Sequence, residues 1–226
     1  MVSLKTKFVA NIPELKHIEE TLPTKVNIHT PEWFKKLKPL IGEMSKYDRG
    51  GTVKRCPSFV DWFKTGYILP MWADSLLNTK REPSWKSASG NYNWDIHHNE
   101  QFLNHIPNNP NNISAVFKAE CPWFMITPKG YSVLQLPLFY NFNEWEVLPG
   151  IIDTDKHHEL NQQIVVYGEK EVFIERGTPL VMYIPFKREE HELEIIYADN
   201  MDKNTKKTLD KYWAEDTTKL YRKYYK

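Results

Sequence analysis

Three side chains in the second half of the sequence belong to the residue types that bind iron: His157, Glu159 and His191. Two histidines and one carboxylate can occupy one face of an Fe(II) ion and leave the other positions open for oxygen and a co-substrate. In a strand, residues two apart point to the same side, so His157 and Glu159 would share a face there. Lys187 or Arg188 would then bind the carboxylate of the co-substrate. This pattern predicts a non-haem Fe(II)-dependent oxygenase as one hypothesis for the function.

These histidines also have a simpler interpretation. The triplet His157–Glu159 follows a predicted strand that ends near residue 152, and it therefore falls in a loop. His191 lies in the charged run Lys187–Glu192, which is typical of a solvated turn. A second group of ligand-type residues, Asp95–Glu100 followed by His105, has no standard metal spacing. We therefore favour surface histidines over a metal site in both places.

The sequence disfavours nucleophilic catalysis and phosphate loops. Cys56 and Cys121 each precede a proline in an apolar setting, and apolar burial raises the pKa of a thiol and makes it unreactive. The motifs G-x-S-x-G and G-x-x-x-x-G-K are absent from the sequence. We expect two buried free thiols, and a disulfide between them is the alternative.

The elements that would position any such site are short strands. From Cys121 to Phe186 the chain is a ladder of β-branched and aromatic runs that are broken at Gly or Pro. The expected strands are 113–119, 122–127, 131–138, 145–152, 162–168, 171–176, 179–186 and 192–198. Short connections between them predict a mainly β (α+β) fold. We expect an antiparallel sandwich, jelly-roll-like or β-clip-like core over 113–199, with short peripheral helices.

The rest of the chain is expected to surround this core as part of a single domain, 1–226. The segment 1–112 would wrap it with a strand at 4–12, short helices at 31–37 and 58–65, and a strand at 67–72. Residues 78–93 are polar and rich in turn formers, which predicts a surface loop. The tail, 200–226, has an imperfect apolar stripe among many lysines, which predicts a C-terminal amphipathic helix. We expect that helix to pack on the core, and nucleic-acid binding by its basic face is the alternative.

The composition restricts the class of protein further. The 226 residues carry a formal net charge of +1, so no global attraction to nucleic acid or to an anionic membrane follows. No apolar run approaches the roughly 20 residues that span a bilayer, and the N-terminus has no signal-peptide pattern. These features predict a soluble, cytoplasmic protein. Aromatic residues make up 14% of the chain, with 8 Trp, which hints at contact surfaces.

Two segments resemble the dUTPase and dCTP deaminase superfamily. Gly150–Asp153 and Arg176–Val181 stand in the order of that family's Gly-Val-Ile-Asp hairpin and its Arg-Gly strand. The resemblance implies a deoxynucleotide ligand with Mg²⁺, and it implies that Asp153 activates water. The family's Tyr-Arg-Gly and Arg-Ser-Ser motifs and its Gly-rich C-terminal clamp have no good match here, which favours shared β topology over shared activity.

A second resemblance covers roughly residues 50–190. Lys54–Asp61 with Gly66–Pro70, and Gly150–Asp155 with Arg176–Pro185, are similar to an uncharacterised family from tailed phages of marine cyanobacteria and from bacteria. This resemblance implies a phage-like origin, with the host cytoplasm or the virion as the location, and it implies no known activity. Our leading hypothesis is therefore a phage-type β protein that acts by binding to itself or to a protein partner. The oxygenase and the dUTPase-like protein are the alternatives.

Overall fold

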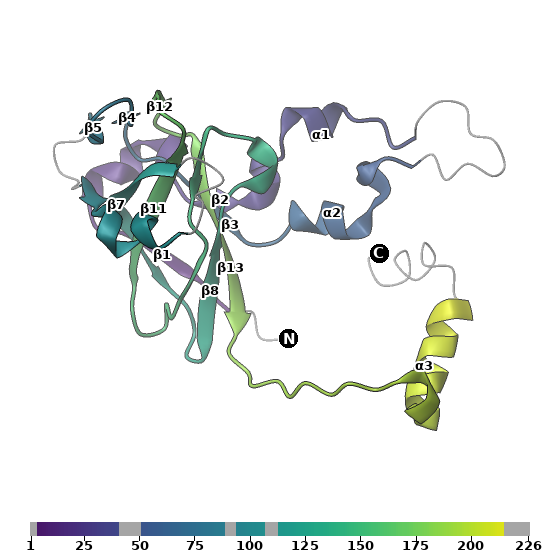
Figure 1. The fold of residues 1–226 in the computed structure, drawn as a ribbon. Coiled ribbons are helices and arrows are strands. Elements are labelled where there is room, and N and C mark those ends of the chain that lie inside the picture. Colours follow the sequence, from purple (N-terminus) through teal and green to yellow (C-terminus); the bar gives the residue numbers. More distant parts are fainter. Residues whose placement is uncertain (1–3, 41–50, 89–93, 107–112, 215–226) are drawn as a thin grey trace. The chain divides into compact units, whose positions relative to one another are not determined.

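The computed structural model describes residues 4–40, 51–88, 94–106 and 113–214. It divides the chain into two compact units, Met1–Arg188 and Glu189–Lys226. Within the described residues the first unit contains three antiparallel sheets, as Figure 1 shows. The predicted mainly β fold with a jelly-roll-like or β-clip-like core is confirmed.

The first sheet is organised around one long strand, β7, which pairs with β1 and β6 on one side and with β11 on the other. Its strands are β1 (Lys7–Ala10), β6 (Trp94–His97), β7 (Ile113–Ile126), β9 (Trp145–Val147) and β11 (Glu159–Tyr167). We expected two strands at 113–119 and 122–127, but the chain continues as one. The pairing with β11 is irregular there, because Glu159 pairs with Phe124 and Asn161 with Glu120. The extra residues Cys121–Trp123 therefore form a bulge in β7, and the proline does not end the strand.

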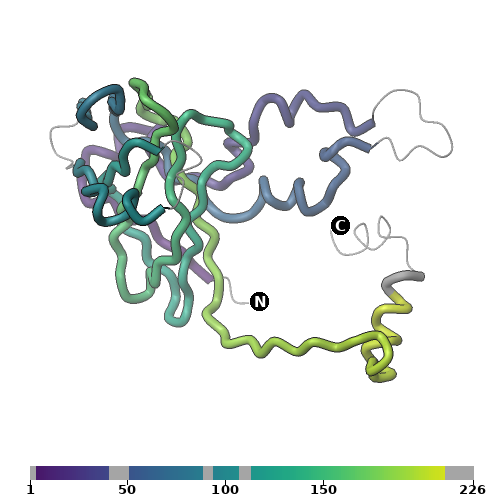
Figure 2. Tube along the Cα trace, in the orientation of Figure 1, coloured from purple at the N-terminus to yellow at the C-terminus, as the bar shows by residue number. Residues whose placement is uncertain are grey.

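In the second sheet the central strand is β13, which comes last of the five in the sequence. The order is β10, β8, β13, β3, β2, and the bounds are β2 (Thr24–Lys25), β3 (Tyr67–Pro70), β8 (Tyr131–Leu136), β10 (Gly150–Ile152) and β13 (Pro179–Lys187). Figure 2 shows these segments from distant parts of the sequence running together in the β core. A third sheet contains β4 (Ser75–Asn78), β5 (Ser84–Ser87) and β12 (Glu171–Ile174). Two of its strands overlap the segment 78–93 that we expected to be a loop.

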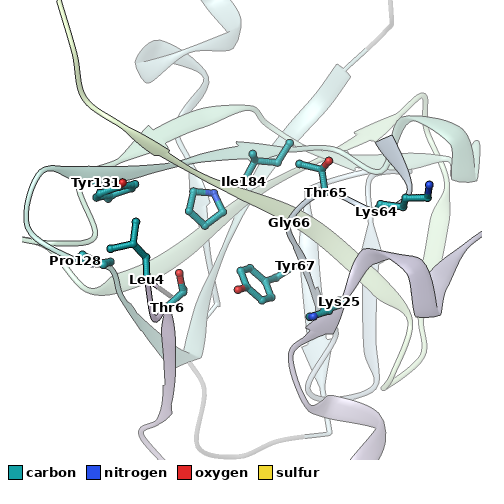
Figure 3. Close-up of a pocket in the computed structure, with 11 residues that line it drawn as sticks. Leu4, Thr6, Lys25, Lys64, Thr65, Gly66, Tyr67, Pro128, Tyr131 and Ile184 are labelled. Atoms are coloured by element: carbon teal, nitrogen blue, oxygen red, sulfur yellow. The ribbon is translucent and has the colours of Figure 1, made fainter. Parts of the chain in front are cut away.

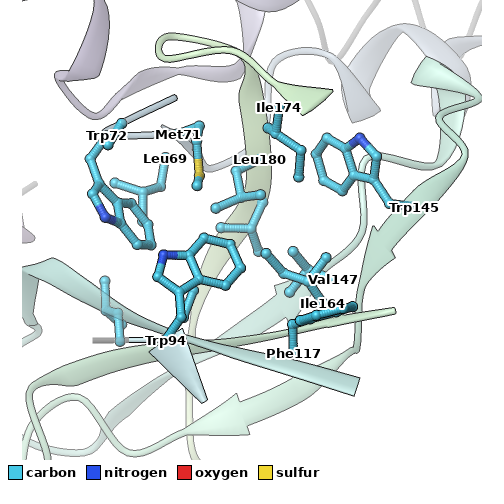
Figure 4. Close-up of a cluster of buried hydrophobic side chains, with 14 of the residues drawn as sticks. Leu69, Met71, Trp72, Trp94, Phe117, Trp145, Val147, Ile164, Ile174 and Leu180 are labelled. Carbon is cyan, nitrogen blue, oxygen red and sulfur yellow. The ribbon is translucent and has the colours of Figure 1, made fainter. Parts of the chain in front are cut away.

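The hydrophobic core lies between the sheets and draws on both halves of the sequence. Phe117 and Ile164 come from the first sheet, Leu69 and Leu180 come from the second, and Trp94 reaches in from β6 (Figure 4). The core is therefore not restricted to the expected range 113–199. Strands before residue 113 supply a large part of it.

A chain of polar side chains crosses this core. The amide Nε2 of Gln162 on β11 donates to the hydroxyl of Tyr183 on β13 at 2.8 Å. That hydroxyl donates to Oε1 of Gln135 on β8 at 3.0 Å, and Nε2 of Gln135 donates to the carbonyl of Leu148 at 2.9 Å. All three side chains are buried. Because an unpaired polar group is costly inside a protein, these bonds hold the two sheets in one register.

The helices of the first unit are short. The α-helices are α1 (Glu32–Lys36) and α2 (Pro57–Trp62), close to the predicted positions. The 3-10 helices are η1 (Pro13–His17), η2 (Glu19–Thr21), η3 (Val26–His29), η4 (Val53–Arg55), η5 (Asn99–Gln101), η6 (Leu103–His105) and η7 (Phe139–Asn141). Both cysteines are free thiols. The prediction that both are buried is wrong for Cys56, which is exposed, whereas burial raises the pKa of the Cys121 thiol.

The second unit begins with a stretch that has no regular secondary structure, from Glu189 to Tyr197. The predicted strand at 192–198 is therefore not formed. An alternating apolar pattern becomes a strand only where a neighbour pairs with its backbone groups. The unit continues with η8 (Ala198–Asn200) and α3 (Lys203–Ala214), and Asp202 caps α3 by accepting from the backbone N–H groups of Asn204 and Thr205. The part of the expected tail helix after residue 214 lies outside the described residues. Among the described helices, none is long and apolar enough to cross a membrane.

Candidate functional site

The turn between β10 and β11 carries two of the site residues that the sequence suggested, Asp153 and His157. The carbonyl of Asp153 accepts from the backbone N–H groups of Lys156 and His157, both at 2.8 Å, which folds the chain back on itself. Thr154 is buried, and its hydroxyl bonds to that of Thr127 at 2.8 Å. The turn is therefore anchored to the end of β7, and the carboxylates of Asp153 and Asp155 are held in defined positions.

Arg188 joins three segments at this end of the fold. Its guanidinium forms a bidentate pair with Asp155, with N–O distances of 2.8 and 2.6 Å. The backbone N–H of Gly130 also donates to Asp155, at 2.8 Å, and the backbone N–H of Arg188 donates to the carbonyl of Gly130. We call this arrangement the Asp–Arg clamp. It links the β7–β8 turn, the β10–β11 turn and the end of β13, and the Asp155 side chain within it is only 4% exposed.

The clamp determines the charge state of its members. The hydrogen bonds from Arg188 and from the Gly130 backbone hold the pKa of Asp155 well below its usual range. The pair with Asp155 correspondingly raises the pKa of Arg188. The guanidinium of Arg188 is already paired with Asp153 and Asp155. The predicted binding of a co-substrate carboxylate by Arg188 therefore stays a prediction. Lys187, the other residue proposed for that role, is exposed at the end of β13.

Asp153 is the more accessible carboxylate, with 42% of its side chain exposed. The Ser132 hydroxyl donates to it at 2.6 Å, and Arg188 lies at 3.1 Å. The Ser132 hydrogen bond is the main cause of its lowered pKa, followed by the charges of Arg188 and Lys156. Asp153 is therefore an oriented anion at neutral pH. It can accept a hydrogen bond from a hydroxyl or from water, but it is a weak base.

The predicted iron ligands lie in different surroundings. His157 is exposed in the turn, and Glu159 is exposed as the first residue of β11. His191 belongs to the second unit, which the structure describes separately. Within the described ranges, no three His, Cys, Asp or Glu side chains form a group that could hold a metal ion. The iron site stays a prediction, which metal analysis of protein purified without chelator would check.

A pocket lies beside the β7–β8 turn, which contributes Pro128 to its wall (Figure 3). Its volume is about 350 Å³, and its walls include Tyr67, Tyr131 and Pro128. Lys25 and Lys64 stand at its edge. Because the clamp holds Gly130, it fixes the turn that supplies one wall. Sequence reasoning did not identify this pocket, since its residues come from five separate segments.

A second feature is a cluster of aromatic rings away from the core. We define the aromatic arm as residues 31–40 and 51–65, which contain α1 and α2, together with Phe139–Phe142 (Figure 1). Phe34 stacks on Phe59 at 5.6 Å between ring centroids, and Tyr140 lies 4.4 Å from Phe59. The indole N–H of Trp33 donates to the Tyr140 carbonyl at 3.2 Å. These contacts join the arm to the loop that follows β8.

The aromatic arm exposes several apolar side chains among its charged residues. Phe142 is 74% exposed and has a left-handed backbone with φ of 53°. A residue other than glycine is uncommon in that conformation, and an aromatic side chain there is strained. Phe139 and Trp33 are exposed as well. The arm therefore presents rings to the solvent at a cost in local backbone energy.

Comparisons with known proteins give only distant similarities. No protein-family model matches the chain, and no curated protein matches it. Among solved structures, the dUTPase of EIAV is similar with a TM-score of 0.36 at 9% identity, over 61% of this chain and 88% of that one. Two structures of the dUTPase from phage phi11 of S. aureus give TM-scores of 0.34 and 0.37 at 9% identity. They cover 71% and 85% of this chain, and 92% and 96% of their own chains. We draw no conclusion about activity from similarities at this level.

Proposed function

We propose that this chain is a phage-type β protein that acts by binding and assembly, with itself or with a protein partner. The exposed apolar surface of the aromatic arm is the observation that carries the proposal. Burying a large apolar side chain contributes roughly 1.5–3 kcal/mol, so Trp33, Phe139 and Phe142 are a substantial unused source of binding energy. The strained backbone of Phe142 supports the same interpretation, because such strain is concentrated at functional positions.

The test is the oligomeric state of the full chain. Native mass spectrometry and light scattering over 1–100 µM should show an oligomer, or a pull-down should recover one defined partner. The double variant Phe139→Ser/Phe142→Ser should weaken the association. Phe173→Ser, at an exposed phenylalanine on β12, is the matched control and should leave it unchanged. A strict monomer with no recovered partner would contradict the proposal.

The second candidate function is deoxynucleotide binding at Asp153, with or without hydrolysis. The specific observation in its favour is that the Gly150–Ile152 strand leads into an ionised, exposed carboxylate that Ser132 orients. A ligand at about 100 times its Kd should stabilise the fold by about 2.7 kcal/mol, so thermal-shift measurements with deoxynucleotides and Mg²⁺ decide the question. The shift should disappear in Asp153→Asn. No shift with any nucleotide would remove this candidate.

A further inference from the structure

The segment that opens the second unit combines acidic and apolar side chains. Glutamates stand at positions 189, 190, 192 and 194, so residues 189–197 carry a net charge of −4 with His191 neutral. Between and after them stand Leu193, which is 87% exposed, and the exposed residues Ile195 and Tyr197. We call residues 189–197 the acidic segment. Its alternation would place Leu193, Ile195 and Tyr197 on one side of an extended chain.

The aromatic arm has the opposite character. Residues 31–40 and 51–65 contain six Lys or Arg and two carboxylates, which gives a net charge of +4. Lys36 lies one helical turn from Trp33 on α1, so a cation and an exposed ring share one face. Lys54 lies 5.8 Å from the centre of the Phe34 ring. The arm therefore offers rings for apolar side chains and cations for carboxylates.

The two surfaces are complementary in charge and in polarity. We infer that the acidic segment of one copy of the chain docks on the aromatic arm of a second copy. This inference rests on the proposed assembly function and names its partner. The chain itself carries both surfaces with equal and opposite charge, so every copy brings one acidic segment and one aromatic arm that can bind such a segment. Reciprocal exchange between two copies closes a two-fold dimer and leaves neither surface exposed.

The inference requires the association to depend on salt. Charges that face each other across a solvated interface are screened beyond about 8 Å at physiological ionic strength. Raising the salt concentration should therefore weaken the dimer, whereas an interface held only by apolar contacts would be insensitive or strengthened.

The experiment replaces glutamates of the acidic segment by lysine and lysines of the arm by glutamate in the full chain. Analytical ultracentrifugation then measures the dissociation constant of the dimer. Glu192→Lys/Glu194→Lys in the acidic segment should weaken the dimer at least tenfold. So should Lys36→Glu/Lys38→Glu in the arm. Each pair of changes brings its surface to a net charge of zero. Combining both pairs in one chain should restore part of the association, because the lysines introduced in the acidic segment can then pair with the glutamates introduced in the arm. A matched control that reverses two exposed glutamates elsewhere, Glu14→Lys/Glu19→Lys, should have no effect.

The outcomes separate this inference from the function on which it rests. An oligomer that ignores both reversals would overturn the inference and leave assembly standing. A wild-type chain that is monomeric at 100 µM and recovers no partner would overturn both. Cross-linking of mixed ¹⁴N- and ¹⁵N-labelled chains should join the segment to the arm between chains, and cross-links only within one chain would refute docking on a second copy. Binding of a single-stranded oligonucleotide by the arm of a monomeric protein would assign the arm to nucleic acid and refute the inference as well.

Discussion

The polar chain through the core makes a quantitative prediction at Tyr183. Replacing Tyr183 with Phe keeps the ring and removes one hydroxyl that takes part in two hydrogen bonds. The amide of Gln162 then loses its acceptor, and Oε1 of Gln135 loses its donor. Each buried polar group left unpaired costs about 1–3 kcal/mol, so the free energy of unfolding should fall by at least about 2 kcal/mol. For a chain of this size that corresponds to a decrease in Tm of roughly 4–8 °C.

Urea unfolding, monitored by tryptophan fluorescence, measures this loss directly. Tyr167→Phe is the control, because its hydroxyl donates to Glu146 at 2.7 Å at a partly exposed site where water can replace it. That control should lose less than about 1 kcal/mol. Gln162→Met should lose less stability than Tyr183→Phe. Oε1 of Gln162 has no hydrogen-bond partner among the described residues, so its removal relieves a cost. If Tyr183→Phe proved no less stable than Tyr167→Phe, the polar chain would not hold the sheets together.

Three further predictions concern the clamp, the turns and the thiols. Because the pKa of Asp155 is lowered in the folded protein, the ionised carboxylate stabilises the fold above the unfolded pKa of about 3.9, and this stabilisation is lost as the pH falls toward the folded pKa. In urea titrations at different pH values, Asp155→Asn should therefore reduce the loss of stability at acidic pH. Gly66→Ala should lower the Tm far more than Gly130→Ala. Both glycines have φ near +85°, but a Cβ at Gly66 would lie 2.3 Å from a carbonyl oxygen of β13. A Cβ at Gly130 would meet no described atom within 4 Å. Equal losses would refute this steric explanation. A thiol reagent should label the exposed Cys56 rapidly in the native protein and the partly buried Cys121, whose pKa is raised, much more slowly. Equally rapid native labelling of both would contradict this prediction.

The strand ladder could be predicted because its signals are local. The segment Thr127–Gly130 has Pro at its second position and Gly at its fourth, which are local turn signals, and Gly130 has φ of 85°. Gly177 marks a turn in the same way. The third sheet was missed because β5 is exposed and polar, and its identity as a strand depends on pairing with β4.

The clamp could not be predicted, because its members are far apart in the sequence. Arg188 reaches Asp155 across 33 residues and Ser132 across 56. Asp153 was selected from a local motif, and the structure adds its partners. For Asp155 the sequence showed only its place at the end of the segment Gly150–Asp155. Nothing in the sequence around it indicates that it would be the more deeply buried carboxylate of the two.

The central place of β13 in the second sheet has a consequence for synthesis. β13 separates β8 from β3, and of the five strands of this sheet it is synthesised last. Until residue 187 has emerged, the edges of β3 and β8 that face it remain open, and sheet edges with unpaired backbone groups are prone to aggregation. The sheet is therefore completed from its middle, after its other four strands have been made. A truncation a few residues before Lys187 would remove the strand that joins its two halves, while one just after Arg188 would leave the first unit intact.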